Sequence, residues 1–265
     1  MPIQVLAHLD AGTLWPQVTT FHVIDVADAY RRALAVRAAR IARGERPVGY
    51  KIGFTNRTIW ERYGVFAPIW GPVWDTTVVH CDGVGTIDLS HTCQPRIEPE
   101  ACFGMSSTPP AGATLEQLFD CIDWVAPSFE VVQSHKRDWV FTAAEGVLDG
   151  ALHARLLVGR RTPVREIATD RAAFDERLAA TRVTLRRGSD TPVVDTGTGA
   201  NVLDGPLHAL HHFVRELATC PGAPSLLPGD VVTTGTWTDA WPVAAGETWR
   251  SSYDDALPSL EVTFR

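Results

Sequence analysis

Three glutamates in two segments of the chain carry its clearest chemical signal. Glu98 and Glu100 are two residues apart in a segment typical of a β-strand, so their carboxylates project from one face, roughly 6 to 7 Å apart at their origins. Glu130 lies among apolar neighbours in a second strand pattern, where an ionised carboxylate is costly unless it is paired or metal-bound. Three oxygen ligands without cysteine or histidine favour a hard ion, Mg²⁺ or Mn²⁺, with about three coordination positions left for water or substrate.

The same spacing also permits an ordinary structural role. The E-x-E pattern is common, and the first two glutamates can lie on a solvated strand face while Glu130 pairs with Arg96 or Lys136. Pro99 stands between the first two and removes a backbone donor, which requires a strand edge or a bulge at that point. From spacing alone, both interpretations stay open.

Three extended segments are expected to position these side chains. The acidic strands are predicted over residues 96–105 and 128–134. A third segment, residues 48–54, carries Lys51 at its centre between two glycines that permit close backbone approach. A lysine on a surface strand would be a solvated charge, but the apolar setting of Lys51 favours a buried, working lysine.

Helical patterns alternate with these strands and give a mixed α/β organisation. Apolar residues recur every three or four positions from 25 to 43, which predicts an amphipathic helix. Thr114 and Gln117 form the signature of a capping box at the start of another helix. Further helices are expected at 170–181 and from Pro206 onward.

Composition limits the classes of partner. The chain has 265 residues, of which 45% are hydrophobic and 21% charged, values typical of a folded globular protein. Its formal net charge of -7 argues against a protein that neutralises many phosphates, so we expect no nucleic-acid partner. We expect the chain to fold alone or as a homo-oligomer.

Cysteine usage and hydropathy indicate a cytoplasmic protein. The five cysteines are odd in number and include no C-x-x-C pair, which argues against both a disulfide framework and a thiolate zinc site. The N-terminus shows no basic segment followed by an apolar run, and no stretch approaches the ~20 apolar residues of a membrane span. No membrane association is expected.

Four motifs follow one another along most of the chain: VGYKIGFT at 48–55, QPRIEPE at 94–100, WVAPSFEVV at 124–132 and GDVVTTG at 229–235. In order and spacing this set resembles the 2-oxopent-4-enoate hydratase and 4-oxalocrotonate decarboxylase family of the fumarylacetoacetate hydrolase superfamily. The segment SHKRDW at 134–139 is also similar to the S-x-x-x-D-W segment of that family. Each motif alone is weak, and the ordered set is specific.

The resemblance implies a Mg²⁺ or Mn²⁺ ion on Glu98, Glu100 and Glu130, which favours the metal interpretation over the structural one. It implies a mixed α/β fold, a fumarylacetoacetate hydrolase-type β-roll of largely antiparallel strands with flanking helices. We expect a small N-terminal helical lobe and pocket loop in residues 1–75 and the catalytic core in residues 76–265. Members of this family are commonly homo-oligomers.

The resemblance also implies roles for four further residues. Lys51 matches the lysine of the G-Y-K-[IV]-G motif and is expected to be a proton shuttle or a carboxylate anchor. Asp75 matches an acidic residue near that point in the family, with a register uncertain by about one or two residues. Thr234 and the backbone of Gly235 are expected to donate hydrogen bonds to the substrate carboxylate.

Two segments depart from the family pattern. The family's L-G-H-P-L-N-A segment stands here as LDGPLHA at 203–209, and its serine-glycine-rich stretch as TGTGA at 196–200, so the substrate stays open. His153 follows Asp149 and could face the pocket, although a core histidine bonded to its neighbours is the simpler interpretation. Three histidines on a predicted helix, His208, His211 and His212, are interpreted as surface or packing residues, because no fourth ligand is evident.

The implied function is that of a metal-dependent lyase on small 2-oxo or 2-hydroxydienoic acids. It is either a hydratase of the 2-hydroxypenta-2,4-dienoate type or a 4-oxalocrotonate-type decarboxylase, and in both the ion would stabilise an enolate. An acylpyruvate-type C–C hydrolase or a 2-oxo acid tautomerase is an alternative. The expected lid at 56–68 contains Glu61 but no histidine, which weighs against the hydrolase. A non-catalytic metal-binding module is a further alternative.

Overall fold

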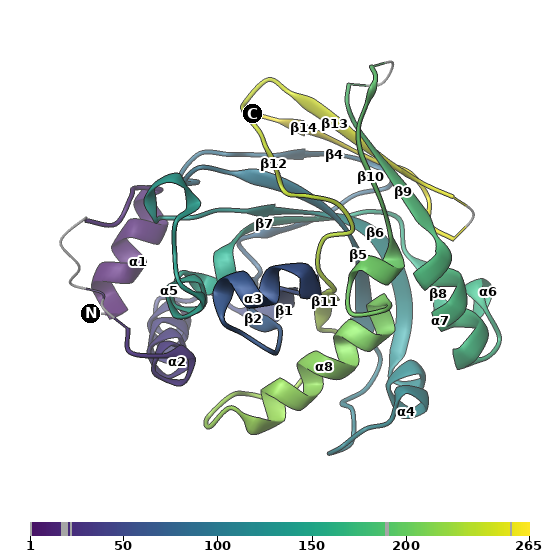
Figure 1. The fold of residues 1–265 in the computed structure, drawn as a ribbon, viewed down its shortest axis with the longest axis horizontal. Helices are drawn as coiled ribbons and strands as arrows, with labels where there is room; N and C mark the ends of the chain where they lie inside the picture. The colour runs from purple at the N-terminus through teal and green to yellow at the C-terminus, as the bar shows by residue number, and fades with distance from the viewer. Residues whose placement is uncertain (1, 17–20, 22, 189–190, 255) are drawn as a thin grey trace.

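The description rests on a computed structural model, in which residues 2–16, 21, 23–188, 191–254 and 256–265 are described. Two β-sheets form the framework (Figure 1). Their strands are β1 Pro47–Gly53, β2 Ile69–Trp74, β3 Val78–His80, β4 Val84–Ile87, β5 Arg96–Met105, β6 Ile122–Val132, β7 His153–Val158, β8 Thr162–Pro163, β9 Arg182–Arg187, β10 Val193–Thr198, β11 Val231–Thr233, β12 Trp241–Pro242, β13 Thr248–Tyr253 and β14 Leu260–Phe264.

The larger sheet has nine strands in the order β2-β1-β11-β5-β6-β7-β3, with β12 also beside β5 and β8 beside β6. The smaller sheet has the order β10-β9-β13-β14-β4. The pairs β1–β11, β3–β7 and β4–β14 are parallel, and the other described pairs are antiparallel. The expected sheet of largely antiparallel strands is therefore confirmed.

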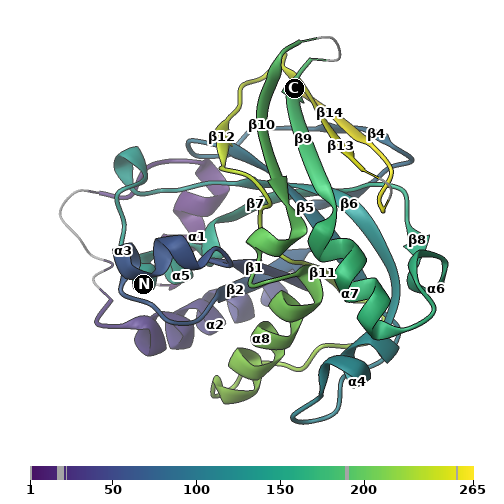
Figure 2. The same ribbon diagram turned by 45° about the vertical axis from the view of Figure 1, so that its right-hand side comes forward.

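Helices flank the larger sheet, as Figures 1 and 2 show from two sides. They are α1 Pro2–Ala11, α2 Val26–Ala42, α3 Trp60–Tyr63, α4 Leu115–Asp120, α5 Ala143–Leu148, α6 Val164–Ile167, α7 Arg171–Ala180 and α8 Pro206–Thr219, with short 3₁₀ turns at Arg57–Ile59, Arg137–Trp139, Gly150–Leu152 and Gly199–Asn201. No helix in the described ranges is long and apolar enough to cross a membrane.

Two apolar clusters hold the layers together. One packs α4, α7 and α8 against the larger sheet and includes Phe119, Phe174 and Phe213. The other lies between the two sheets, where Phe129 of β6 meets Trp249 of β13. The central strands β5 and β6 are thus covered on their apolar positions, which fixes the direction in which their alternate side chains point.

Local signals in the sequence correspond closely to several elements. The strand β5 has the predicted bounds, α2 begins at the cap Asp25, and Thr114 and Gln117 make the predicted capping box of α4. β6 begins at Ile122, six residues before the predicted start, so Pro127 lies inside this strand.

Two prolines sit inside the central strands at gaps in the neighbouring ladder. The carbonyl of Pro99 accepts a hydrogen bond from Trp237 N–H at 3.0 Å, between the stretches of β5 that pair with β11 and β12. The carbonyl of Pro127 accepts from Gly159 N–H at 2.9 Å, between the stretches of β6 that pair with β7 and β8. The N–H and C=O groups of one residue in an antiparallel strand point to the same side. Each proline therefore lacks its N–H where a gap separates two pairing strands, so no ladder hydrogen bond is lost. This gap takes the place of the strand edge or bulge that Pro99 requires.

Residues 1–75 contribute both to the helical lobe and to the larger sheet. Helices α1 and α2 pack with α5 in one apolar cluster, which forms the small helical lobe. Strands β1 and β2, however, extend the larger sheet through pairing of β1 with β11. Residues 47–75 therefore belong with the sheet, and the lobe ends before Pro47.

Gly49 allows β1 to approach β11. Its φ is +152°, and a Cβ at this position would lie 1.9 Å from the carbonyl oxygen of Val231. No side chain fits there, so the glycine brings β1, and with it Lys51, against the centre of the sheet.

We expect Gly49→Ala to lower the free energy of unfolding by about 2 kcal/mol more than Gly44→Ala, because overpacking against backbone adds to the backbone strain. Gly44 is the matched control, since its φ is +100° and a Cβ added there would meet nothing within 4 Å. Urea unfolding of both variants measures the difference. Equal destabilisation would show that the contact of Gly49 with Val231 does not limit the fold.

Candidate metal and substrate site

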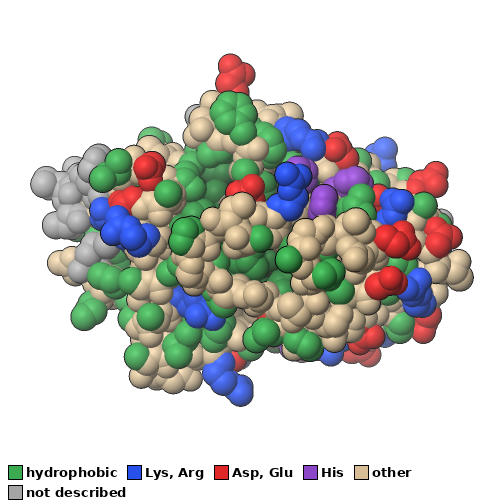
Figure 3. All heavy atoms as spheres, turned by 90° about the horizontal axis from the view of Figure 1, so that it is seen from below, with side chains coloured by type: hydrophobic (Ala, Val, Ile, Leu, Met, Phe, Trp, Pro, Cys, Tyr) green, Lys and Arg blue, Asp and Glu red, His purple; other side chains and the backbone are tan. Residues whose placement is uncertain are grey.

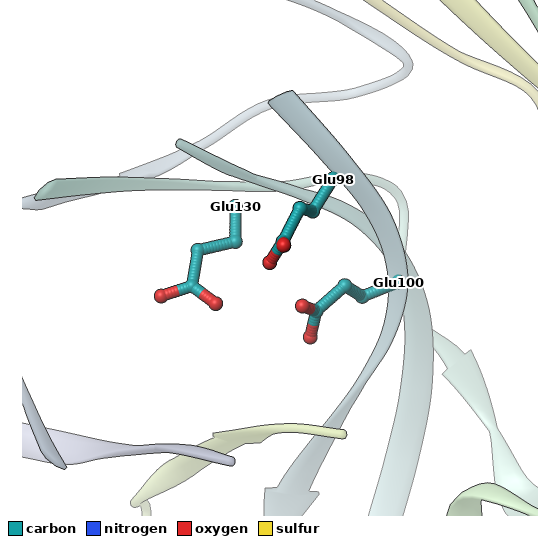
Figure 4. A group of neighbouring side chains, drawn as sticks. All are labelled: Glu98, Glu100 and Glu130. Carbon is teal, nitrogen blue, oxygen red and sulfur yellow. The ribbon is translucent and has the colours of Figure 1, made fainter. Parts of the chain in front are cut away.

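The register of β5 and β6 brings the three glutamates together. Glu98 of β5 stands directly opposite Glu130 of β6, and Glu100 follows two residues later on the same face. One carboxylate oxygen from each of the three lies within 4.8 Å of the others. Figure 4 shows all three side chains pointing toward a common centre. The three carboxylates therefore form a group that could hold a metal ion.

Burial makes the ionised form of these three carboxylates energetically unfavourable unless a positive charge lies nearby. Glu100 and Glu130 are completely buried, and Glu98 is half-buried. Burial and the neighbouring Glu130 raise the pKa of Glu98 to about 7, although Lys51 opposes the shift. Burial and repulsion from both other carboxylates raise the pKa of Glu100 well above its ordinary value.

Glu130 keeps its charge through two partners. Its Oε2 lies 3.1 Å from Lys51 Nζ, and its Oε1 lies 2.8 Å from Nδ1 of His153. Burial alone would raise the pKa of Glu130, but Lys51 and His153 lower it below the ordinary value. Lys136, one of the partners considered from the sequence, instead bonds Glu145 at 2.7 Å.

Lys51 is buried at the centre of β1, as its apolar setting predicted. Its side chain is 3% exposed. Burial would lower the pKa of Lys51, but attraction to Glu130, Glu98 and Glu100 outweighs it and raises the pKa above the ordinary value. Lys51 is therefore an ammonium ion next to the carboxylates.

The donor set fits a hard divalent cation. Oε2 of Glu100 accepts a hydrogen bond from Gly235 N–H at 2.8 Å, whereas its Oε1 is buried without a hydrogen-bond partner among the described residues. An unpartnered, buried carboxylate oxygen beside two other carboxylates is the environment that a metal ion stabilises. The single positive charge of Lys51 can balance only one of the three carboxylates.

Through Glu98, the carboxylate cluster borders a cavity between β1, the turn after β11 and the segment before α5. Its polar lining includes Lys51, Glu98 and Arg96. Aromatic rings form one wall, where Phe54 stacks on Tyr63 at 4.6 Å and Tyr63 on Phe141 at 5.4 Å between centroids. These rings enclose the polar end of the cavity in an apolar surround.

Several residues of this lining hold unfavourable backbone conformations. Phe54, Trp139, Ala151 and Leu152 all line the cavity and have φ between +54° and +69°. Positive φ is rare for non-glycine residues, and clusters of such strain occur at ligand-binding and active sites.

Comparison with known proteins places the chain in a family. No family model matches it. It is 30% identical to a 4-oxalocrotonate decarboxylase from Pseudomonas sp, over 87% of this chain and 84% of the relative. It is also 30% identical to a 2-keto-4-pentenoate hydratase from Paraburkholderia xenovorans, over 83% of this chain and 77% of the relative.

The chain belongs to the 4-oxalocrotonate decarboxylase and 2-keto-4-pentenoate hydratase family. A solved structure of 4-oxalocrotonate decarboxylase from Pseudomonas putida G7, complexed with magnesium and adipate, superposes on it with a TM-score of 0.87 and 28% identity, covering 100% of this chain and 95% of that one. The fold expected from the resemblance is thereby confirmed.

Three residues that are expected to act on substrate make hydrogen bonds within the protein. Asp75 lies past the end of β2 and bonds Arg46 N–H and Nε, both at 3.0 Å, outside the lining of the cavity. Thr234 donates its hydroxyl proton to Ala101 O at 3.0 Å. The N–H of Gly235 donates a hydrogen bond to Oε2 of Glu100. The roles of Asp75, Thr234 and Gly235 toward substrate therefore stay predictions, and in this structure their hydrogen bonds go to Arg46, Ala101 and Glu100.

Gly235 has a structural reason to be glycine. Its φ is +96°, and a Cβ there would lie 1.9 Å from Oγ1 of Thr55. The residue turns the chain after β11 so that its N–H meets Glu100. Gly235 thus orients the carboxylate of Glu100.

His153 is both a buried core histidine and a neighbour of the site. Its Nδ1 contacts Glu130, and its Nε2 lies 2.9 Å from Oγ1 of Thr77. The ring therefore links the third glutamate to the segment before β3. Histidine spacing alone could not reveal this contact, because β6 and β7 pair only in the folded chain.

The histidines of α8 stay apart from the carboxylates. Histidine side chains gather beside basic side chains on one face of the molecule (Figure 3). On α8, Nε2 of His208 bonds Asp175 at 2.9 Å. The glutamate cluster is the metal-capable group found among the described residues, which agrees with the interpretation of these histidines as surface or packing residues.

Metal binding should depend on pH because Glu98 holds a proton below about pH 7. An entering cation must displace that proton, and the raised pKa of Glu100 adds a second proton to the same competition, so we expect the affinity for Mn²⁺ to fall at least tenfold for each pH unit below about 7. Calorimetric titration with MnCl₂ across this range measures the slope. A flat profile would contradict the raised pKa.

His153 should orient Glu130 for metal binding. We expect His153→Phe to weaken Mn²⁺ binding about 10- to 100-fold, because Glu130 loses a hydrogen bond that fixes its carboxylate. Electron paramagnetic resonance of free Mn²⁺ measures the affinity. His208→Phe is the control, since that histidine bonds Asp175 away from the cluster; equal effects of the two variants would remove the role of His153.

Proposed function

We propose that this protein is a divalent-metal-dependent lyase acting on small 2-oxo or 2-hydroxydienoic acids, as a hydratase or a decarboxylase. The observation that carries the proposal is the convergence of three carboxylate oxygens within 4.8 Å beside a buried lysine, at the end of a cavity. The named activities of its relatives, at about 30% identity over most of the chain, support the same two reactions.

Glu98, Glu100 and Glu130 would hold the ion, and we propose Mg²⁺ or Mn²⁺. Oxygen-only ligation suits both ions, and magnesium accompanies the decarboxylase of Pseudomonas putida G7 in its solved structure. When bound, the ion supplies Lewis acidity that draws electrons toward a 2-oxo group.

Lys51 would act as an acid or as an anchor. As an ammonium ion beside Glu130 it can donate a proton to the substrate chain or bind a substrate carboxylate, but it cannot accept a proton in this state. The positive charge is held in place by its bond to Glu130 and by the burial of β1.

Both candidate reactions move electrons to the same atom. In decarboxylation of a 2-oxo-3-enedioate, the bond between C5 and the distal carboxylate breaks and CO₂ leaves, while its electron pair shifts through the C3=C4 double bond to the 2-oxo oxygen. In hydration, the dienol first becomes a 2-oxo-3-enoate, because its 2-hydroxyl loses a proton and C5 of the substrate gains one. Water then adds its oxygen to C4 and loses a proton, while the electron pair of the C3=C4 double bond shifts toward the 2-oxo oxygen. A proton added at C3 completes the 4-hydroxy-2-oxo acid. The aromatic wall of Phe54, Tyr63 and Phe141 would limit access of bulk water to these carbons.

The hydrolase alternative receives no support from the expected lid. Glu61 is exposed and is absent from the cavity lining, and the described residues of 56–68 include no histidine. The burial of Lys51 against the glutamates also favours catalysis over a passive metal-binding module.

Assembly and compartment complete the proposal. We propose a homo-oligomer, in keeping with the family resemblance, and a cytoplasmic location. The five cysteines are all free thiols, a state that a reducing compartment preserves.

Glu98→Gln tests the function. We expect loss of metal-dependent turnover of both 2-hydroxypenta-2,4-dienoate and 2-oxohex-3-enedioate, on the order of 10³-fold in kcat/KM, because an essential charge of the site is removed. Turnover is followed by ultraviolet absorbance of the conjugated substrate, with circular dichroism as a check of the fold. Glu61→Gln, exposed and outside the cavity, is the control and should stay active; unchanged activity of Glu98→Gln would refute the assignment.

A further inference from the structure

We propose that the cavity is built for a 2-oxo acid that carries a second carboxylate at its far end, and that Arg96 binds this group. The inference rests on the proposed function for the near end of the substrate, at the glutamates. It concerns which of the two substrate classes the site prefers.

Arg96 lies on the same face of β5 as the glutamates and lines the same cavity. It precedes Glu98 by two residues, so the two side chains start roughly 6 to 7 Å apart along the strand. In the register with β6 it stands opposite Val132, as Glu98 stands opposite Glu130. Along this face of the two strands, an acidic pair is therefore followed by one cationic and one apolar side chain.

The guanidinium of Arg96 is held in place without a carboxylate partner. Its Cζ lies 4.3 Å from the centroid of the Trp139 ring, and the indole N–H of Trp139 donates to Gln94 O at 3.1 Å. Among the described residues no carboxylate oxygen lies within the 4.0 Å limit of an ion pair with Arg96. Stacking on a ring uses the face of a guanidinium and leaves its in-plane N–H donors available.

The other charged groups of the lining do not satisfy this cation. Glu98 belongs to the carboxylate cluster, and Lys51 is bonded to Glu130. Asp239 is exposed at the rim, where solvent screens its charge.

A carboxylate is the group that matches this site. The planar guanidinium offers paired N–H donors that fit the two oxygens of a carboxylate. Val132 and Leu152 line the same cavity, and their apolar surface suits a short hydrocarbon chain. A short unsaturated 2-oxo dicarboxylic acid has all three features, whereas a 2-hydroxydienoate with a terminal alkene leaves Arg96 unpaired.

Arg96 should act on KM more than on kcat. It binds the distal carboxylate as an ion in the bound substrate, and that charge disperses as CO₂ leaves, so the arginine gives no added stabilisation to the transition state. The kinetic signature of this specificity residue is therefore a rise in KM for the dicarboxylate.

The kinetic test compares 2-oxohex-3-enedioate with 2-hydroxypenta-2,4-dienoate on wild type and on Arg96→Met. We expect the variant to lose about 10- to 100-fold more kcat/KM on the dicarboxylate than on the monocarboxylate, mainly through KM. Arg57→Met is the matched control, because it removes the same charge from an arginine already bonded to Asp204. The Arg57→Met variant should not change the ratio of the kcat/KM values for the two substrates.

A binding test does not depend on turnover or on the folding of a variant. Calorimetry with Mg²⁺ present compares 2-oxoadipate with 2-oxohexanoate on the wild type, and we expect the dicarboxylate to bind about tenfold or more tightly. Arg96→Lys should keep part of this preference and Arg96→Met should lose it.

Equal loss of both substrates in Arg96→Met, or equal wild-type affinity for the two oxo acids, would overturn the role of Arg96 while leaving the lyase function intact. If the wild-type protein turned over neither substrate, the proposed function would fail. The calorimetric comparison would still decide whether Arg96 binds a second carboxylate.

Discussion

Mutual repulsion among three carboxylates at the centre of a sheet is the constraint on which this molecule is built. Glu100 and Glu130 are fully buried and Glu98 is half-buried, and their oxygens converge within 4.8 Å. A Coulomb repulsion of this kind is several kcal/mol even in a moderately polar interior. Lys51 and His153 stabilise Glu130, and Gly235 donates to Glu100, but one oxygen of Glu100 is left without a partner among the described residues. The elements around the cluster therefore serve to hold the charges together until a cation completes the site.

The strands meet this constraint through their neighbours. Pro99 and Pro127 place gaps in the ladders beside β5 and β6, and the chain that follows β11 crosses the first of these gaps. That crossing segment supplies the N–H of Gly235 to Glu100, so the irregularity in the ladder is part of the site. Gly49 brings Lys51 against the same strands from the other side. Stability and function are thus coupled through backbone positions that bear no reactive group.

The sequence contained enough to predict the elements with local signals and the residues within one motif. The bounds of β5, the capping box of α4 and the pairing of Glu98 with Glu100 on one face follow from period-two spacing and side-chain capping. The long-range contacts were different. His153 reaches Glu130 through the register of β6 and β7, and Trp139 supports Arg96 from a turn with positive φ, neither of which leaves a pattern in the sequence. Motif position assigns Asp75, Thr234 and Gly235 to the site, but it does not reveal their hydrogen-bond partners Arg46, Ala101 and Glu100, which depend on the folded chain.

The polarity of the cavity follows from the same period-two rule that places the glutamates. Positions 96, 98 and 100 share one face of β5, so whatever residue stands at 96 must line the approach to the carboxylates. A hydrophobic residue there would continue the apolar wall, whereas an arginine held on Trp139 makes the approach electropositive. In the binding mode that we propose, one end of an anionic substrate would meet Arg96, and only the end able to chelate a hard ion would bind among the glutamates. The order of charges along a single strand would then orient the substrate.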